Sequence, residues 1–386
     1  MPRNGAVAMK RMAVDLLVVG AGPTGCVFAE RAATVLNWRV LVVEKRDHVG
    51  GNCHDPLHPS GVRIHRYGPH YFRTNSKRVV AYLSRFTEWI PARYEVKALV
   101  DGALLPFPIN LDTMQGFFGR AFSPRSARAF LRRQQLPLPV VKTSEQYLLK
   151  TVGRELYEAF YAQYTAKQWG RHPSQLSASV CARVPIRFSR ETRYSEHIFQ
   201  QMPRDGYTAL FQRMLSHPKI EVWLDCEYAA IRHWVRPRHA TVYSGPLDAF
   251  FGLAKGKLPW RSLRFEFKTI DAEFVQPCVQ INYPDERAYT RSVEIKHVTG
   301  QRHPRTVIAY EFPSEAGEPF YPIPSAETAA LVAAYRALAR QTWEKERVIF
   351  AGRLATYQYL DIDQVVLRSL RMFDRQIRPL GRNDSD

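Results

Sequence analysis

Two short apolar runs near the start of the chain predict buried strands. The first ends at Val18-Val19, just before a glycine-rich turn, and the second covers residues 40–43, just before Glu44. The segment that separates them has room for a helix. The order therefore predicts a strand, a tight turn, a helix, a second strand and an acidic residue at the end of that strand.

A helical period replaces this pattern in the middle of the chain, from about residue 112 to 180. Segments near 114–135 and 144–169 are predicted to be amphipathic helices. The second of these segments is rich in aromatic residues: Tyr147, Tyr157, Phe160, Tyr161, Tyr164 and Trp169.

From Arg183 onward, apolar and polar residues alternate, which predicts an antiparallel sheet of strands separated by turns. The alternation occurs at 261–267, 279–283, 290–297 and 305–312. The end of the chain reverts to an α/β pattern. It predicts a helix from Ser325, its N-cap, to Arg340, a buried strand at 347–351 and a last helix opened by Asp361.

The turn after the first strand has the spacing of a dinucleotide-binding motif. Gly20 permits the tight turn, Gly22 lets backbone amides approach a pyrophosphate, and Gly25 allows close packing of helix on strand. Glu44 follows Gly20 by 24 residues, where a carboxylate can accept hydrogen bonds from both ribose hydroxyls. The second glycine pair, Gly50-Gly51, favours FAD over NAD.

Because the nucleotide-binding pattern begins near one end of the chain and finishes near the other, other domains must be inserted into it. We predict an α/β protein in which a discontinuous FAD-binding Rossmann-like domain accommodates an inserted helical domain and an antiparallel β-sheet domain. The predicted bounds are 14–90, 206–256 and 326–378 for the FAD domain, 91–180 for the helical domain, 181–205 and 257–325 for the sheet domain, and 1–13 and 379–386 for disordered tails.

Composition narrows the class of protein. The chain has 386 residues, of which 45% are hydrophobic, and no run of eighteen apolar residues that could span a membrane. Its five cysteines are scattered, with no two in CxxC spacing, which argues against zinc and a disulfide framework. A reducing, cytoplasmic location is expected.

The formal net charge of +19 raises the question of nucleic-acid binding. The arginines are spread along the chain, however, and no helix-turn-helix, zinc-finger or RNP pattern accompanies them. We therefore expect no nucleic-acid partner. A smaller anionic ligand, such as FAD together with a nucleoside diphosphate, accounts for some of the arginines.

Further motifs extend over most of the chain, from Asp15 to about Phe373. In order they are Glu44-Lys45-Arg46 with His48 and Gly50-Gly51-Asn52, Arg66-Tyr67-Gly68-Pro69-His70, Pro106-Phe107-Pro108-Ile109-Asn110, residues 164–170, residues 183–188, Tyr289-Thr290-Arg291, Glu318-Pro319-Phe320-Tyr321-Pro322 and Gly352-Arg353-Leu354-Ala355. Together they resemble the flavin-dependent UDP-galactopyranose mutases of bacteria. These enzymes have a discontinuous FAD domain, a helical domain and a sheet domain, in agreement with the division above.

The resemblance implies a non-redox isomerase that interconverts the pyranose and furanose forms of a nucleotide sugar, with UDP-galactose as the expected substrate. Reduced FAD attacks the anomeric carbon through N5, and the sugar opens as a flavin iminium before it recloses. The resemblance also implies NAD(P)H or a reductase as electron source, and a homodimer.

The same resemblance assigns roles to individual residues. Arg183, on a mobile loop, and Arg291 match the arginines that clamp the pyrophosphate, and His70 matches a histidine beside the flavin. The substrate-binding positions are Phe160, Tyr164, Trp169, Tyr194, Tyr321, Tyr359 and Asn110. The cofactor-binding positions are Gly20, Gly22, Gly25, Glu44, Lys45, Gly51, Asn52, Arg353, Asp361, Gln364 and Arg261. No metal site is expected.

Departures from the family pattern leave the sugar and the nucleobase open. Leu360 replaces an aromatic residue, Asp205 stands where a glycine pair is usual, and residues 252–256 differ from the usual aromatic stretch. UDP-N-acetylgalactosamine and dTDP-linked sugars remain alternatives. An amine-oxidase-like flavin oxidoreductase, and an anion-binding flavoprotein without catalysis, are the competing classes.

Overall fold

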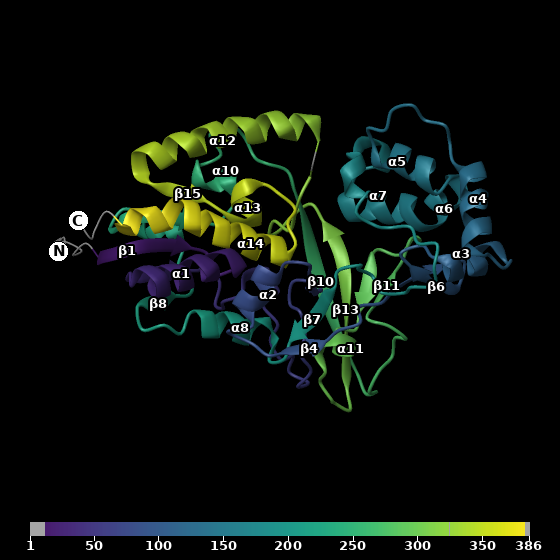
Figure 1. The fold of residues 1–386 in the computed structure, drawn as a ribbon, viewed down its shortest axis with the longest axis horizontal. Coiled ribbons are helices and arrows are strands. Elements are labelled where there is room, and N and C mark those ends of the chain that lie inside the picture. The colour runs from purple at the N-terminus through teal and green to yellow at the C-terminus, as the bar shows by residue number, and fades with distance from the viewer. Residues whose placement is uncertain (1–11, 324, 383–386) are drawn as a thin grey trace, which may run out of the picture.

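A computed structural model describes residues 12–323 and 325–382 of the chain (Figure 1). Its nucleotide-binding unit is built on a five-stranded sheet in which all four neighbouring pairs are parallel. In spatial order the strands are β15 (Val348–Phe350), β9 (Val235–Tyr243), β1 (Met12–Val19), β2 (Val40–Val43) and β8 (Ile220–Trp223). Strands from both ends and from the middle of the chain therefore form one sheet, which confirms a discontinuous domain.

Both faces of this sheet are buried, so β2 and residues 16–19 of β1 are apolar at every position rather than at alternate ones. Leu16 and Val18 pack on one face with the residues of α1 (Pro23–Leu36). Leu17 and Val19 pack on the other face, in a separate cluster. Figure 1 shows α12 (Ala326–Glu346) above the strands and α8 (Gly206–Met214) below them.

The turn between β1 and α1 depends on two glycines for different reasons. Gly20 has a φ of 100°, and a Cβ there would lie 2.2 Å from Ser244 Oγ. The Ser244 hydroxyl donates to the Val19 carbonyl at 2.7 Å, which ties β9 to this turn. A Cβ on Gly25 would lie 1.9 Å from the Gly20 carbonyl oxygen, so the helix could not approach the strand as closely with any other residue.

A seven-stranded sheet forms the second unit, and each predicted strand at 261–267, 279–283, 290–297 and 305–312 contributes to it, although the predicted 290–297 strand ends at Val293 and residues 296–299 are helical. In spatial order its strands are β14 (Tyr321–Pro322), β10 (Trp260–Ile270), β13 (Thr306–Ser314), β12 (Arg291–Val293), β11 (Gln280–Asn282), β5 (Val96–Val100) and β6 (Ala103–Phe107). Neighbouring strands are antiparallel except β11 and β5, which pair in parallel.

The strands β5 and β6 lie within residues 91–180, which the sequence analysis placed in the helical domain. Val96, Ala98 and Val100 alternate with less buried residues, which is the pattern of a half-buried strand. This hairpin extends the sheet, and the helical unit begins only at Leu111.

The helical unit contains α3 (Leu111–Phe118), α4 (Pro124–Gln134), α5 (Ser144–Thr151), α6 (Arg154–Tyr157) and α7 (Gln163–Trp169). Each of the two predicted helical segments is therefore interrupted. Gly119, with a φ of 65°, ends α3, and Gly153, with a φ of 81°, precedes α6. A π-helical turn at residues 158–162 joins α6 to α7. Figure 1 shows this unit at the upper right, apart from the nucleotide-binding unit.

A small sheet joins the other units. Its order is β3 (Phe72–Thr74), β7 (Phe199–Pro203) and β4 (Trp89–Pro91). The segment 181–205, predicted to belong to the sheet domain, contributes β7 to this small sheet instead, and residues 181–198 contain no helix or strand. The shorter helices are α2 (Lys77–Leu83), α9 (Tyr228–Ile231), α10 (Leu247–Phe250), α11 (Lys296–Thr299) and α13 (Gly352–Thr356).

The predicted end of the chain is confirmed in its main features. The Ser325 hydroxyl accepts from the Thr328 N–H at 3.1 Å and so caps α12, as expected for this residue. Asp361 caps α14 (Ile362–Met372), in a capping box with Gln364.

The tails were predicted at 1–13 and 379–386. Residues 1–11 and 383–386 lie outside the described residues, but Met12 and Ala13 already belong to β1 and residues 378–382 form a 3₁₀ helix. Met12 and Ala13 are part of the sheet because they pair with β9. Within the described ranges, no helix is both long and apolar enough to cross a membrane.

Replacing Gly25 by alanine should destabilise the protein by about 1–3 kcal/mol or more, because the new methyl group has no space. Gly102→Ala is the matched control: it has a φ of 79° but no atom within 4 Å of the added Cβ, so it tests backbone strain alone. Urea unfolding of both variants measures the difference. A smaller loss for Gly25→Ala than for Gly102→Ala would contradict the steric argument.

Candidate functional site

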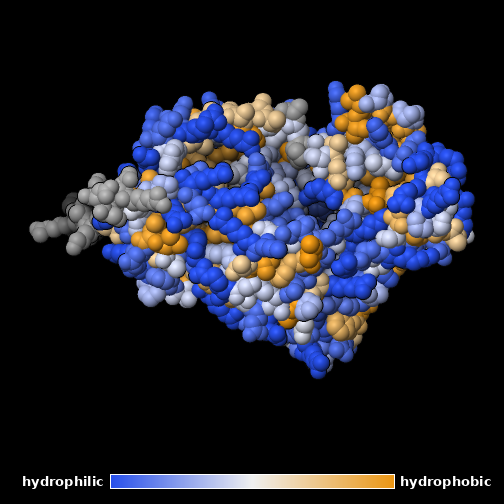
Figure 2. Space-filling model, viewed as in Figure 1, coloured by the Kyte–Doolittle hydropathy of each residue, from blue (hydrophilic) through white to orange (hydrophobic). Residues whose placement is uncertain are grey.

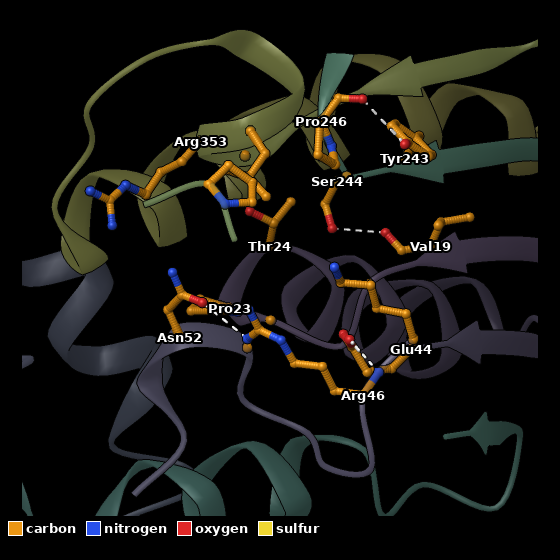
Figure 3. A pocket seen from close by; sticks show the side chains of 18 of the residues that line it. Val19, Pro23, Thr24, Glu44, Arg46, Asn52, Tyr243, Ser244, Pro246 and Arg353 are labelled. Atoms are coloured by element: carbon orange, nitrogen blue, oxygen red, sulfur yellow. Dashed lines mark hydrogen bonds between the residues drawn. The ribbon is translucent and has the colours of Figure 1, made fainter. Parts of the chain in front are cut away.

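A cavity of about 420 Å³ opens at the carboxyl ends of the parallel strands (Figure 3). Gly22, the N-cap of α1, lies on its wall, so the first backbone N–H groups of this helix are available to an anion. Gly51 packs against the same turn, since a Cβ there would lie 3.0 Å from the Gly22 Cα. This glycine-to-glycine contact brings two backbone segments together on the wall of the cavity.

Acidic and basic side chains line one end of the cavity. The Glu44 carboxylate accepts from the Ala21 N–H at 2.8 Å and from the Arg46 N–H at 3.1 Å, which fixes its orientation. Lys45 forms an ion pair with Glu318 at 2.7 Å, and Arg46 donates to the Asn52 side-chain oxygen at 3.0 Å. Figure 3 shows Glu44, Arg46 and Asn52 beside the α1 turn.

Arg353, on α13, lies at the other end of the cavity, away from Glu44 (Figure 3). Its Nε is buried and has no hydrogen-bond partner among the described residues. His70 lines the same cavity, and its Nδ1 is 2.8 Å from the Gly68 carbonyl oxygen. Burial is the main cause that lowers the pKa of His70 to about 4, so the imidazole is neutral near pH 7.

Arg353 also belongs to a second group of side chains, here called the arginine–tyrosine cluster. Its members are Arg73, Arg183, Arg291, Arg353, Tyr194, Tyr321, Tyr359, Glu311 and Asp361. The rings of Tyr321 and Tyr359 stack with centroids 5.6 Å apart. The guanidinium of Arg183 lies 3.9 Å above the Tyr359 ring, and that of Arg353 lies 4.7 Å from it. Arg353 therefore belongs both to the cavity and to this cluster.

The sheet side of the cluster is held by a buried ion pair. Arg291, on β12, donates to Glu311 Oε1 at 2.6 Å and to the Tyr321 hydroxyl at 3.3 Å. Glu311, on β13, is only 1% exposed. Burial alone would lower the pKa of Arg291, but the surrounding groups, Glu311 first among them, together outweigh burial and raise that pKa well above its ordinary value.

The cluster carries an excess of positive charge. The cluster contains four guanidinium groups and two carboxylates. Arg73 donates to Asp361 at 3.0 Å, and Arg291 donates to Glu311. These six groups sum to +2. A half-buried positive excess of this kind attracts an anion whose negative charge has a similar magnitude. Guanidinium groups suit phosphate oxygens in particular.

The same field acts on the two stacked tyrosines in opposite directions. For Tyr359, burial opposes ionisation, but Arg183 and Arg353 outweigh it and lower the pKa. Burial, with the Glu311 carboxylate, raises the pKa of Tyr321. At neutral pH Tyr321 is therefore a hydroxyl donor, and the Tyr359 hydroxyl lies in a strongly positive environment.

A cleft of about 440 Å³ leads into the cluster from between α12 and the helical unit. Trp169 and Arg183 line it on one side and Arg336 on the other. Figure 2 shows the molecular surface hollowed between these two parts. Trp169 also contacts Tyr321, with ring centroids 6.1 Å apart.

Comparison with known proteins places these features in a family. The model of the UDP-galactopyranose mutase family matches residues 159–359, and that of NAD(P)-binding Rossmann-like domains matches residues 18–86. A probable UDP-galactopyranose mutase of Klebsiella pneumoniae is 37% identical over 378 residues, which cover 96% of each chain. This chain belongs to the UDP-galactopyranose mutase family.

Two further comparisons agree with this membership of the mutase family. A dTDP-fucopyranose mutase of Escherichia coli is 33% identical, over 92% of this chain and 96% of its own length. The crystal structure of a reduced UDP-galactopyranose mutase superposes with a TM-score of 0.74 over 95% of this chain and 94% of that one. At 14% sequence identity, that likeness shows the shared fold.

Most of the residues that the resemblance selected converge on this part of the mutase-family fold. The structure brings Arg183, Arg291, Tyr321 and Tyr359 together, and Arg73 lies over the ring of Tyr194 at 5.8 Å. Other predicted positions lie on the walls of the cavity or cleft: Gly20, Gly22, Glu44, Lys45, Gly51, Asn52, His70, Arg353 and Trp169.

Two predicted substrate-binding residues have structural contacts. Asn110 is fully buried and caps α3, where its side-chain oxygen accepts from the Thr113 N–H at 2.9 Å. Phe160 is 3% exposed and packs edge-on against Phe117. Neither side chain presents a free face or polar group to the cleft. Tyr164, one helical turn after Phe160, remains partly exposed.

Three predicted cofactor-binding residues also have structural contacts. Arg261 is not on the cavity wall: it donates to the Gln168 and Lys167 carbonyls and so caps the C-terminus of α7. The Gln364 side chain accepts from the Asp361 N–H in the capping box. Gly25, as described above, permits helix packing. A cation at a helix C-terminus and an N-cap partner are both ordinary structural uses of these residues.

Sequence reasoning missed several members of the site. Arg73 and Glu311 belong to the cluster, and Glu318 pairs with Lys45 over the cavity. The sequence could have indicated Glu311, because a carboxylate within a largely apolar strand requires a buried partner. Arg73 gave none, because it comes from a short strand in a sheet that the pattern did not predict.

Acidification from about pH 6.5 to 5 should destabilise the protein. His54 stacks on His48, and burial is the main cause that lowers the pKa of His54 to about 4, as it does for His70. An unfolded histidine has a pKa of about 6.5, so in this window the unfolded chain binds protons that the folded one does not. The free energy of unfolding therefore falls as the pH falls, and the contribution is complete above pH 6.5.

Urea titrations at several pH values measure this decline. The His54→Gln variant should show a shallower decline over the same window, because one of the depressed groups is gone. An equally steep decline in the variant would contradict the assignment.

Proposed function

We propose that this protein interconverts the pyranose and furanose forms of a nucleoside diphosphate sugar, with UDP-galactose as the favoured substrate. One observation carries the proposal: a dinucleotide-type cavity adjoins a cluster with excess positive charge, and Arg353 lies in both. A nucleoside diphosphate sugar carries two negative charges on its diphosphate diester. These charges would balance the net positive charge of the cluster.

FAD is the cofactor that we propose for the cavity. The residues that would hold it are the α1 N-terminus at Gly22 for the pyrophosphate, Glu44 for the ribose, and Arg353 and His70 at the flavin end. The buried, unpartnered Nε of Arg353 and the glycine-lined turn support this fit. When bound and reduced, FAD supplies the nucleophile for the anomeric carbon of the sugar.

The role proposed for Arg183 and Arg291 is to hold the diphosphate while its bond to the sugar is broken and remade. Arg291 is fixed by Glu311, whereas Arg183 lies on the segment 181–198 without helix or strand. A rigid cation on one side and a cation on an irregular segment on the other suit a clamp that admits and then retains a substrate.

The tyrosines complete the proposed anion site. Tyr321 keeps its proton and donates to a phosphate oxygen, since its pKa is raised. Tyr359, between Arg183 and Arg353, adds a hydroxyl where negative charge is favoured. In the cleft beyond them, Trp169 offers aromatic surface for the nucleobase.

The similarity to the dTDP-fucopyranose mutase supports a second candidate substrate class, the dTDP-linked sugars. UDP-N-acetylgalactosamine is a third. The amine-oxidase-like alternative is less well supported, because an apolar amine substrate has no use for four guanidinium groups. All five cysteines are free thiols, which supports a reducing, cytoplasmic location.

The decisive experiment is to reduce the purified, FAD-bound protein with dithionite and incubate it with UDP-galactofuranose, and in parallel with dTDP-fucofuranose. Conversion to the pyranose should require reduction and should be faster with the UDP sugar. Faster conversion of the dTDP sugar would select the second substrate class. No conversion of any nucleotide sugar by the reduced protein would refute the proposed function.

Replacing Arg291 by alanine should lower turnover by at least about 10²- to 10³-fold while FAD stays bound, because the fixed cation of the clamp is lost. The flavin absorbance of the purified variant and its turnover give the two readings. Arg264→Ala is a suitable control, since Arg264 lies on β10 and pairs with Glu266 at the surface. Near-normal turnover in Arg291→Ala would show that this residue does not hold the diphosphate.

A further inference from the structure

A small cavity lies beside Glu311, the partner of Arg291, between the seven-stranded sheet and residues of the segment 64–69. Its volume is about 10 Å³, and most of its wall is apolar, with Phe265, Val293 and Val307 among the lining residues. Two polar side chains also line it, His65 at 4% exposure and Glu311 at 1%. His65 Nε2 and Glu311 Oε2 are both buried without a hydrogen-bond partner in the described part of the chain.

The hydrogen bond on the other side of the His65 ring fixes which of these atoms donates. His65 Nδ1 accepts from the His70 backbone N–H at 2.9 Å, so this nitrogen carries no proton. Burial, assisted by the neighbouring His70, lowers the pKa of His65 well below its ordinary value. The ring is therefore neutral, and its one proton is on Nε2. A donor and a carboxylate acceptor thus face the same cavity.

The cavity has the size and lining that one water molecule requires. A volume of about 10–15 Å³ accommodates a single water, provided that polar groups are present to bond it. Gly68 keeps this space open, because a Cβ there would lie 3.2 Å from the Phe265 ring and 3.4 Å from Glu311 Oε2. Its φ of 88° is one that other residues rarely adopt.

We propose that one buried water joins His65 Nε2 to Glu311 Oε2, and that His65 and Glu311 together are positioning residues for Arg291. Glu311 uses its other oxygen, Oε1, to hold Arg291, which in turn reaches the Tyr321 hydroxyl. A carboxylate that is bonded through both oxygens has a fixed orientation, and so has the guanidinium bonded to it. The inference rests on the proposed role of Arg291 in diphosphate binding.

The network also connects the two halves of the site. The His70 backbone donates to His65, and the His70 side chain lines the dinucleotide cavity. A continuous set of hydrogen bonds therefore leads from the wall of that cavity, through the water, to the cation proposed to bind the substrate. His65 itself touches neither ligand site, which is why it acts only through Glu311.

Two substitutions of His65 separate this role from simple support of the 65–70 turn. The amide nitrogen of glutamine reaches about as far as Nε2, so His65→Gln retains a donor toward the cavity and loses the Nδ1 acceptor. The oxygen of asparagine stands about where Nδ1 does, so His65→Asn keeps the bond to the His70 N–H and loses the donor. The FAD-bound variants are titrated with UDP by calorimetry.

His65→Asn should weaken UDP binding by roughly 5- to 10-fold, the effect of one lost hydrogen bond, while His65→Gln stays within about twofold of the parent protein. The proposal would be overturned if His65→Asn bound UDP as tightly as the parent, or if His65→Gln were the weaker of the two.

A second measurement does not depend on substrate. A high-resolution crystal structure of the FAD-bound parent protein should show a water within about 3.2 Å of both His65 Nε2 and Glu311 Oε2. An empty cavity, or a direct bond between the two side chains, would overturn the water bridge. Failure of the parent protein to bind UDP would instead refute the proposed function, and the crystallographic result would still decide the bridge.

Discussion

The centre of this protein depends on an excess of positive charge that is held partly out of water. Arginine is almost never buried without a partner, and here four guanidinium groups share two carboxylates and the faces of three tyrosines. The buried Arg291–Glu311 pair is the fixed point of the group. Arg73 pairs with Asp361, and Arg183 and Arg353 are held by cation–π contacts. Because cation–π contacts leave N–H groups free, the cluster keeps donors available to an anionic ligand.

Each arginine reaches the cluster from a different part of the fold. Arg291 comes from the seven-stranded sheet, Arg73 from the small sheet, Arg353 from α13, and Arg183 from the irregular segment 181–198. The helix α13, which carries Arg353, begins at Gly352, where a Cβ would lie 2.7 Å from Thr24 Oγ1. Close packing of α13 on α1 therefore keeps the cluster beside the dinucleotide cavity.

Sequence reasoning succeeded where a pattern is local. The glycine spacing, Glu44 and the apolar runs predicted the βαβ unit because each of these residues meets a requirement of the nearby backbone. Ser325 as a cap and Asp361 as the start of the last helix were predicted for the same reason. Asn110, Phe160 and Arg261 were selected as ligand-binding residues by the resemblance, and the structure gives each of them a packing or capping contact with the helical unit. A motif records which residues occur together and does not separate ligand contacts from structural ones.

The sequence by itself determined the class of fold, the cavity for a dinucleotide and the family. Only the tertiary structure decided which charges meet, because the hydrogen bonds of Arg291 with Glu311 and of Arg73 with Asp361 join residues far apart in the chain. It also decided that β5 and β6 extend the large sheet and that β7 does not. Strand pairing and charge pairing are contacts across space, and no local periodicity encodes the partner.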